Sequence, residues 1–178
     1  MEEIYIDEHL LLRDAELKDI EDYIFIPFDK ELLKMYGSSM NYKTPKSREK
    51  SILLIEEIQN EPYEWAIVYN NIFIGQVRLV IDEANNKSKF AIGIFNPKYW
   101  SIGIGTKVTN AVLNYGFTKL KLHKIYLRVL KYNKRAIKSY EKAGFVIEGE
   151  ERDSAFIKGR YYNDIHMGIL KEEYFNRK

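Results

Sequence analysis

Three runs of strand-forming residues follow one another between Trp65 and Phe95. They read WAIVY, IFIGQVRLVI and KFAIGIF. The pair Asn70-Asn71 separates the first two runs and is a hairpin signal, and a polar turn at Asn85-Asn86 separates the second from the third. Strands joined by such short turns pair in antiparallel fashion. This segment therefore predicts three consecutive antiparallel strands.

The rest of the chain alternates between strand-like and helical hydrophobic periods. The resulting order, β α α β β β α β α β β, predicts an α/β fold in which helices flank a mixed, mainly antiparallel twisted sheet of about six to seven strands. Outside the three central strands, we expect strands over 9–13, 123–130, 145–150 and 160–170, and helices over 15–24, from Thr44-Pro45 to Pro62, after Pro97, and from Asn133 to Gly144.

Composition narrows the classes of function. A chain of 178 residues with 46% hydrophobic content can bury one substantial core, so we expect a single domain over residues 1–178. A formal net charge of +2 gives no reason to expect a nucleic-acid or membrane partner. The acidic amino terminus lacks a signal-peptide pattern, and we expect a cytoplasmic protein. The lack of cysteine excludes disulfides, a thiol nucleophile and cysteine-ligated zinc, and we expect no metal.

A glycine-containing turn stands between the third central strand and the next helix. It reads Trp100-Ser101-Ile102-Gly103-Ile104-Gly105-Thr106. Glycines let a ligand approach the backbone, and the first turn of a helix offers unpaired N–H groups at the positive end of its dipole. The spacing fits neither the dinucleotide fingerprint nor the P-loop. The turn is a candidate pyrophosphate site, but a G-x-G taken alone is more often only a structural tight turn.

A later predicted helix carries two polar residues on a similar face. Asn133 and Tyr140 are seven residues apart, about two helical turns, so their side chains fall on a similar face. A tyrosine on an apolar helical face often only packs in the core with its hydroxyl satisfied. The pair alone leaves a packing role and a catalytic role open.

Three segments together resemble the GNAT N-acetyltransferases, especially the branch of ribosomal-protein, spermidine and amino-sugar acetyltransferases. They are PKYWSIGIGTKVTNAVLNYGF, LHKIYLRVLKYNKRAIKSYEKAGFVIEGE and FIKGRYYNDIHMGIL. The glycine turn, the N-x-x-A-x-x-x-Y helix and the following G-F occur in the family's order. The resemblance implies the GNAT fold and an acetyl-CoA-dependent N-acetyltransferase, without identifying the amine acceptor.

The resemblance also implies roles for individual residues. In the family, the turn holds the CoA pyrophosphate through backbone amides, and the strand before it hydrogen-bonds the pantetheine arm. An asparagine contacts the cofactor, and a tyrosine protonates the departing thiolate while a neutral amine attacks the thioester in a ternary complex. Tyr140 is the predicted general acid, and the predicted cofactor-binding residues are Ile94, Phe95, Trp100, Ser101, Ile102, Gly103, Ile104, Gly105, Thr106 and Asn133.

Two departures from the family's pattern affect the site. The family's turn often contains a lysine that is missing here, so Lys98 or Lys107 would have to supply the charge. Many relatives also carry a glutamate on the strand before the turn that acts as a base, and this strand reads Phe90-Ala91-Ile92. The base is therefore unassigned. The candidates are Glu64, Asp82, Glu83 and His123, with a structural role favoured for His123, or ordered water.

The acceptor stays open. In the family the first two helices, their connection and the last hairpin line the acceptor side, which implies residues 28–45 and 160–164 here. The basic stretch KTPKSREK slightly disfavours a polyamine acceptor, because like charges repel, although such a stretch also suits a solvated helix surface. A protein α-amino group, a nucleotide-linked amino sugar and a small amine remain. The alternative is a non-catalytic CoA-binding module, and a homodimer is compatible with this branch.

Overall fold

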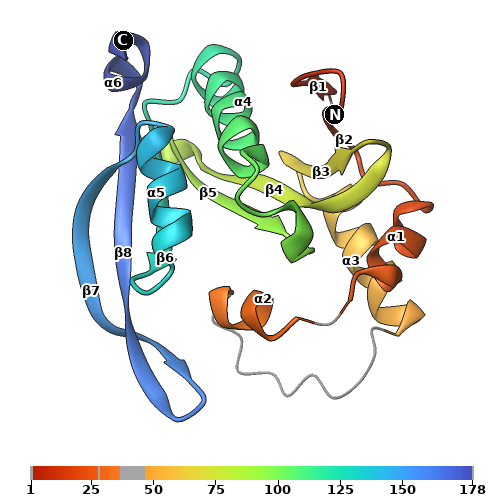
Figure 1. The fold of residues 1–178 in the computed structure, drawn as a ribbon. Coiled ribbons are helices and arrows are strands. Elements are labelled where there is room, and N and C mark those ends of the chain that lie inside the picture. The colour runs from red at the N-terminus through yellow and green to blue at the C-terminus, as the bar shows by residue number, and fades with distance from the viewer. Residues whose placement is uncertain (1, 28, 37–46, 178) are drawn as a thin grey trace.

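The computed structural model describes residues 2–27, 29–36 and 47–177. Within these residues one sheet of eight strands runs in the order β1-β2-β3-β4-β5-β6-β8-β7. Neighbouring strands are antiparallel except β5 and β6, which are parallel. The predicted fold class is confirmed (Figure 1). The strand that the sequence did not predict is β1, a two-residue segment that pairs with β2.

The helices and strands have the following bounds. The strands are β1 Ile4–Tyr5, β2 Leu10–Arg13, β3 Glu64–Tyr69, β4 Ile72–Asp82, β5 Lys87–Ile94, β6 Lys124–Leu130, β7 Val146–Ile157 and β8 Arg160–Leu170. The α-helices are α1 Asp19–Phe25, α2 Lys30–Met35, α3 Arg48–Asn60, α4 Ile104–Thr118, α5 Lys134–Lys142 and α6 Lys171–Asn176. Of the described helices, none is long and apolar enough to cross a membrane.

Two short helices, α2 and α6, were not predicted. Each has six residues, too few for a clear hydrophobic period, and each depends on a local cap. The Asp29 carboxylate accepts a hydrogen bond from the backbone of Leu32 at the start of α2. The predicted start of the second helix at Thr44-Pro45 lies outside the described residues, and α3 is described from Arg48, with Ser47 as its N-cap.

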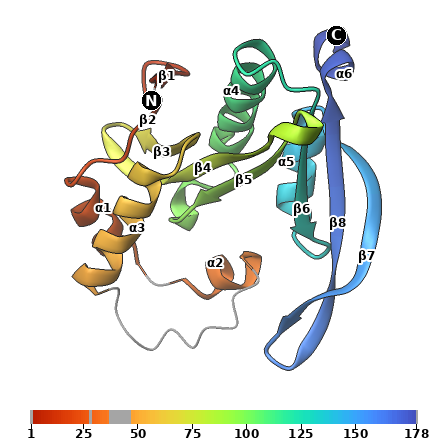
Figure 2. The ribbon, with the colours of Figure 1, turned by 180° about the vertical axis from the view of Figure 1, so that it is seen from behind.

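Helices cover both faces of the sheet (Figures 1 and 2). The larger apolar cluster joins α4 and α5 to one face, through residues such as Val77, Leu79 and Val108. The smaller cluster joins α1 and α3 to the other face of β3 and β4, through Ala66 and Ile55. Because side chains alternate along a strand, residues next to Val77 and Leu79 in β4 point to the face that α1 and α3 share.

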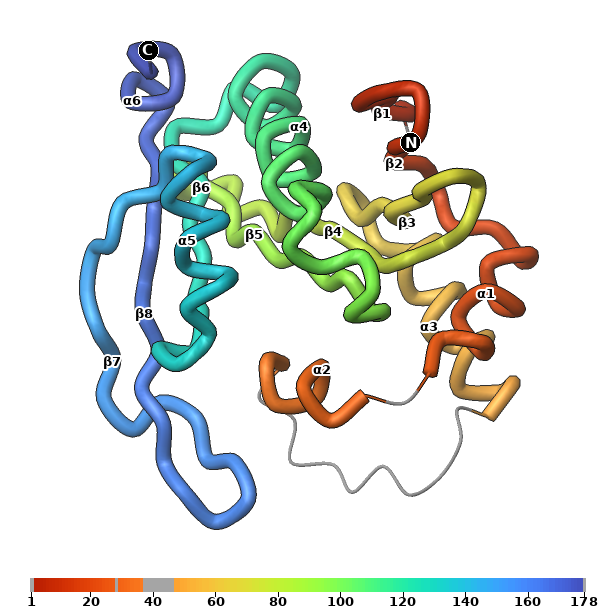
Figure 3. Tube along the Cα trace, in the orientation of Figure 1, coloured from red at the N-terminus to blue at the C-terminus, as the bar shows by residue number. Residues whose placement is uncertain are grey.

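The two parallel strands of the sheet separate soon after they meet. β5 and β6 pair only from Lys87 to Lys89, opposite Lys124 to Tyr126. From residue 90 onwards β5 still pairs with β4 but has no partner strand on its other side. Figure 3 shows the two strands diverging, with α2 lying across the open end. The divergence leaves one edge of β5 free in the middle of the sheet.

Candidate active site

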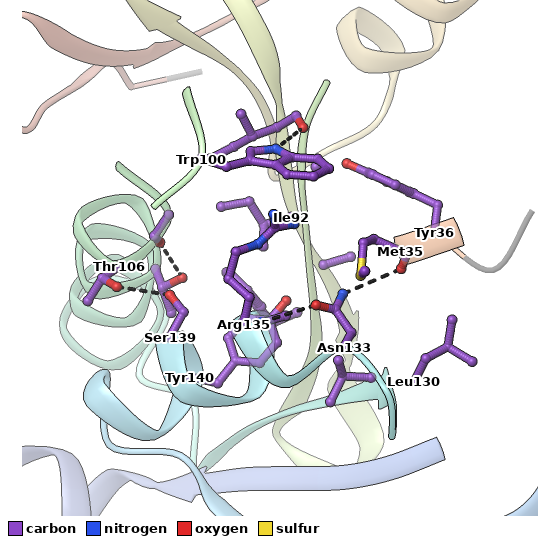
Figure 4. A pocket seen from close by; sticks show the side chains of 18 of the residues that line it. Met35, Tyr36, Ile92, Trp100, Thr106, Leu130, Asn133, Arg135, Ser139 and Tyr140 are labelled. Atoms are coloured by element: carbon purple, nitrogen blue, oxygen red, sulfur yellow. Dashed lines mark hydrogen bonds between the residues drawn. The ribbon is translucent and has the colours of Figure 1, made fainter. Parts of the chain in front are cut away.

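A cavity of about 820 Å³ opens where β5 and β6 diverge. This volume falls in the range of small-molecule sites. Residues of the glycine turn, α2, β4, β5, β6 and α5 line it, so it is reached from both faces of the sheet. Figure 4 shows the side chain of Trp100, from the turn after β5, and those of Arg135 and Tyr140, both from α5, converging on it.

Most of the side chains singled out from the sequence line this cavity. Phe95, Ile102 and Ile104 do not: Phe95 packs against Tyr23, with 5.3 Å between ring centroids, Ile104 is buried in the main core, and Ile102 is exposed. The predicted residues that do line the cavity are Ile94, Trp100, Ser101, Gly103, Gly105, Thr106, Asn133 and Tyr140.

The glycine turn presents the start of α4 to the cavity. Gly103 is the N-cap residue and has φ of 91°, a left-handed conformation that strains other residues. The N–H groups of the first helical turn have no carbonyl partner within the helix. The Thr106 hydroxyl lies 2.9 Å from the Ser139 hydroxyl, which ties α4 to α5. The turn thus offers free amide donors beside a fixed helix pair.

Trp100 connects the end of β5 to α5. Its indole N–H donates to the carbonyl of Ile94 at 2.9 Å. The guanidinium carbon of Arg135 lies 3.5 Å from the centre of its ring system, a cation–π contact. Trp100 therefore holds the free edge of β5 at a fixed position relative to Arg135 (Figure 4).

The positive charge near the turn comes from α5. The Lys107 ammonium pairs with Asp7 at 2.7 Å and the Lys98 ammonium lies over the Tyr99 ring, and neither lysine lines the cavity. Arg135, Lys138 and Lys142 of α5 line it instead. These three cations were not predicted from the sequence, although their spacing of three and four residues places them on one helical face.

Tyr140 faces the cavity from the inner side of α5. Its ring packs edge-on against Phe90 and Phe145, with centroid distances of 6.1 Å and 5.8 Å. Burial disfavours the charged phenolate and raises the pKa of Tyr140 to about 12. Its hydroxyl has no hydrogen-bond partner among the described residues, so it can donate a proton or a hydrogen bond to a bound molecule.

Asn133 links α5 to α2 beside the cavity. Its side-chain oxygen caps α5 by accepting from the backbone N–H of Ala136 at 3.2 Å. Its side-chain nitrogen donates to the carbonyl of Met35, at the end of α2, at 3.5 Å. This structural role accounts for its burial, and the cofactor contact remains a prediction.

Helix α2 forms the wall of the cavity opposite α5. It lies within the range 28–45 that was expected to line the acceptor side, but the helix itself was not predicted. The Tyr132 hydroxyl, next to α5, donates to the carbonyl of Lys34. Tyr36 follows α2 and covers Gly93 so closely that a β-carbon added at Gly93 would lie 2.1 Å from the Tyr36 hydroxyl oxygen. Glycine at 93 therefore leaves room for the Tyr36 side chain, which would have to shift if a β-carbon were present. Asp164 also lines the cavity, at the far end of the range 160–164.

None of the four candidate bases lines the cavity. Glu64 is 1% exposed, and burial raises its pKa, although Arg78 at 3.6 Å acts in the opposite direction. Hydrogen bonds from Asn85 lower the pKa of Asp82. Glu83 and His123 have exposed side chains. The base stays unassigned, and within the described part of the chain no cluster of three or more metal-ligating side chains occurs.

The site defines an α/β protein in which a parallel strand pair diverges beside a glycine turn at the start of a helix. The sequence model of the Acetyltransferase (GNAT) domain matches residues 9–146. This chain belongs to the GNAT acetyltransferase family, which confirms the resemblance seen in its sequence.

The chain is similar in sequence to named relatives and in structure to solved proteins. The spermidine N(1)-acetyltransferase of Escherichia coli K12 is 42% identical over 101 residues, which cover 56% of this chain and only 54% of that enzyme. The prophage-derived N-acetyltransferase YokL of Bacillus subtilis 168 is 29% identical over 94% of this chain and 93% of its own length. The crystal structure of the Vibrio cholerae spermidine N-acetyltransferase with CoA and spermine aligns with a TM-score of 0.75 and 29% identity, over 96% of this chain and 100% of that one.

Proposed function

We propose that this chain transfers the acetyl group of acetyl-CoA to a primary amine by direct attack in a ternary complex. The observation that carries the proposal is that the glycine turn, the free edge of β5 and the side chain of Tyr140 all open into one cavity. Family membership supports an acyltransferase, and the Vibrio relative was crystallised with CoA.

The described residues fit an elongated cofactor with an anionic head. The amide donors at the start of α4 and the three cations of α5 suit phosphate groups. The free edge of β5 from residue 90 to Gly93 suits an arm that contains amide groups, because main-chain donors and acceptors there lack a neighbouring strand. The Ile94 carbonyl, next in the strand, already accepts from the Trp100 indole. Acetyl-CoA, when bound, supplies the activated acetyl thioester. Asn133, Ile94, Phe95 and residues 100–106 remain its proposed contacts, and Phe95, Ile102 and Ile104 would contribute through their main chain because their side chains lie outside the cavity.

Tyr140 is the proposed general acid. The nitrogen of a neutral amine attacks the thioester carbon, the carbon–sulfur bond breaks, and the phenol gives its proton to the departing sulfur. Solvent takes the proton that the amine loses and restores the proton of Tyr140. No residue is acylated, in keeping with a chain that has no cysteine.

The names of the spermidine-acetylating relatives support a small amine over a protein terminus, although these enzymes align over only about half their length. A single domain over residues 1–178, a cytoplasmic location and a homodimer are likewise proposals.

Replacing Tyr140 with Phe tests the assignment. We expect turnover to fall by about two to three orders of magnitude, the usual contribution of a positioned acid, with acetyl-CoA affinity retained. The measurement is CoA release from acetyl-CoA with a panel of amines, alongside acetyl-CoA titration calorimetry. Tyr161→Phe, on the exposed part of β8, is the matched control. Unchanged turnover in Tyr140→Phe would remove the acid role, and acetyl-CoA binding without CoA release for any amine would favour a non-catalytic module.

A further inference from the structure

The cavity has a second end on the sheet face opposite α4 and α5. Gln76 and Arg78 alternate with Val77 and Leu79, whose side chains lie in the core beneath α4, so these two polar side chains point the other way. In the neighbouring strand Gly93 pairs with Gln76, and Ala91 pairs with Arg78. This end is separate from the glycine turn and the α5 cations, and an acceptor amine would enter through it.

Positive charge predominates among the side chains that line this end. Arg78, Lys89 and Arg128 line it, and among the described lining residues Asp164 is the single carboxylate. A polyamine needs carboxylates to hold its several ammonium groups, and three cations would repel it. The lining therefore favours a molecule with a negative charge.

The carboxylates near these cations leave donor groups uncommitted. The Arg78 guanidinium is 3.6 Å from Glu64 and 4.0 Å from Glu57, and the Arg128 guanidinium is 3.7 Å from Glu151 and 3.9 Å from Asp164. All four contacts are ion pairs that are longer than a typical hydrogen bond, so they offset part of the guanidinium charge but leave N–H groups that can donate to an anion. Glu57, Glu64 and Glu151 lie outside the lining.

Lys89 stands apart from the two arginines because no carboxylate lies within ion-pairing distance of it in the described part of the chain. Its side chain is only partly exposed, at the point where β5 and β6 begin to separate. A half-buried ammonium without a counter-ion is costly, and a bound anion would supply the missing partner.

Gln76 lies two residues before Arg78, roughly 7 Å along the strand. Gln76 lines the cavity, and its side-chain oxygen is buried and accepts no hydrogen bond from the described residues. An amine N–H bound beside Gly93 would satisfy this oxygen, which is otherwise costly to bury. The unpaired oxygen of Gln76 and the guanidinium of Arg78 thus lie on the same face of β4, on residues that are neighbours along that face.

We propose that the acceptor is an amine that also carries a carboxylate or phosphate group. Its nitrogen donates to Gln76, and its anion is held by Arg78, Lys89 and Arg128. This substrate class rests on the proposed acetyl transfer, and it differs from the polyamine named for the spermidine-acetylating relatives.

The test uses matched pairs of probes with the full chain. One pair is 6-aminohexanoate and its amide, the other is glucosamine 6-phosphate and glucosamine, and spermidine represents the polyamines. Each probe is titrated by calorimetry into CoA-saturated protein, and CoA release from acetyl-CoA is measured separately. The variant is Lys89→Gln, which breaks no ion pair of the described fold, and the control is Arg152→Gln, which removes one charge from exposed β7 outside the cavity.

We expect the charged member of at least one pair to bind about tenfold or more tightly than its neutral partner. Lys89→Gln should abolish most of that preference without changing acetyl-CoA affinity, and Arg152→Gln should preserve it. The pair that shows the preference tells whether the site binds a carboxylate or a phosphate group. Equal binding within both pairs, tightest binding of spermidine, or an unchanged preference in Lys89→Gln would overturn the inference. Charge-selective binding without any CoA release would contradict the proposed acetyl transfer and would leave the inference about the anionic group intact.

Discussion

Tyr140 illustrates how burial sets the chemistry of one side chain. A phenol ordinarily ionises at a pKa of 10.0, and here burial moves the pKa to about 12. Because the shift is upward, the protonated form that can act as an acid persists above the pH at which a free tyrosine loses its proton. We therefore expect no loss of turnover from Tyr140 ionisation up to about pH 10.5, as measured by kcat at saturating acetyl-CoA and amine.

The same pH series on Tyr140→Phe serves as the control. Any fall of kcat that both proteins share comes from another group or from unfolding, which circular dichroism at each pH would detect. A fall with an apparent pKa near 10.0, present in the parent chain and missing from the variant, would contradict the raised pKa.

Some residues of the cavity could be predicted from the sequence and others could not, for a physical reason. Gly103 and Tyr140 were found because a turn and a helix carry local signals, and both line the cavity. Gln76 and Lys89 carry no such signal, because their importance comes from the divergence of β5 and β6, which is set by strand pairing far apart in the sequence. Hydrophobic alternation predicts a strand, but not which edge of it stays free.

At the scale of elements, α2 is held by neighbours more than by its own sequence. Six residues cannot form a stable helix alone, and the Tyr132 hydroxyl bonded to the Lys34 carbonyl is one of its few anchors. Tyr132→Phe removes that bond, worth about 0.5–1.5 kcal/mol net. We expect amide hydrogen exchange in α2 to become roughly two to ten times faster, as followed by mass spectrometry, while exchange in α4 is unchanged.

Tyr161→Phe removes an exposed hydroxyl of β8 and should leave exchange in α2 as it was. An α2 that exchanges at the parent rate in Tyr132→Phe would mean that Asn133 and Tyr36 suffice to dock it. Asp29 caps the start of α2 and Ser47 caps the start of α3, so local sequence explains where both helices begin. The docking of α2 against its neighbours depends on the folded chain and could not be predicted from local sequence.

At the scale of the whole molecule, the cavity joins two faces of one sheet. The glycine turn and α5 cations lie on the helix-covered side, and Gln76 and Arg78 lie on the other, so cofactor and acceptor can be bound together. The chain also lacks a cysteine that could carry the acetyl group between them. Both features favour a ternary complex over a covalent acetyl-enzyme, because proximity alone can supply a large part of the rate.

Initial-rate kinetics distinguish these two routes. When acetyl-CoA is varied at several fixed amine concentrations, we expect double-reciprocal lines that intersect, since both substrates must be present before CoA leaves. Parallel lines would indicate that CoA departs first and that a residue holds the acetyl group. Intact mass spectrometry after incubation with acetyl-CoA alone provides the independent check: an unmodified chain agrees with direct transfer through the gap between β5 and β6, and a stoichiometric acetyl adduct that an added amine discharges would contradict it.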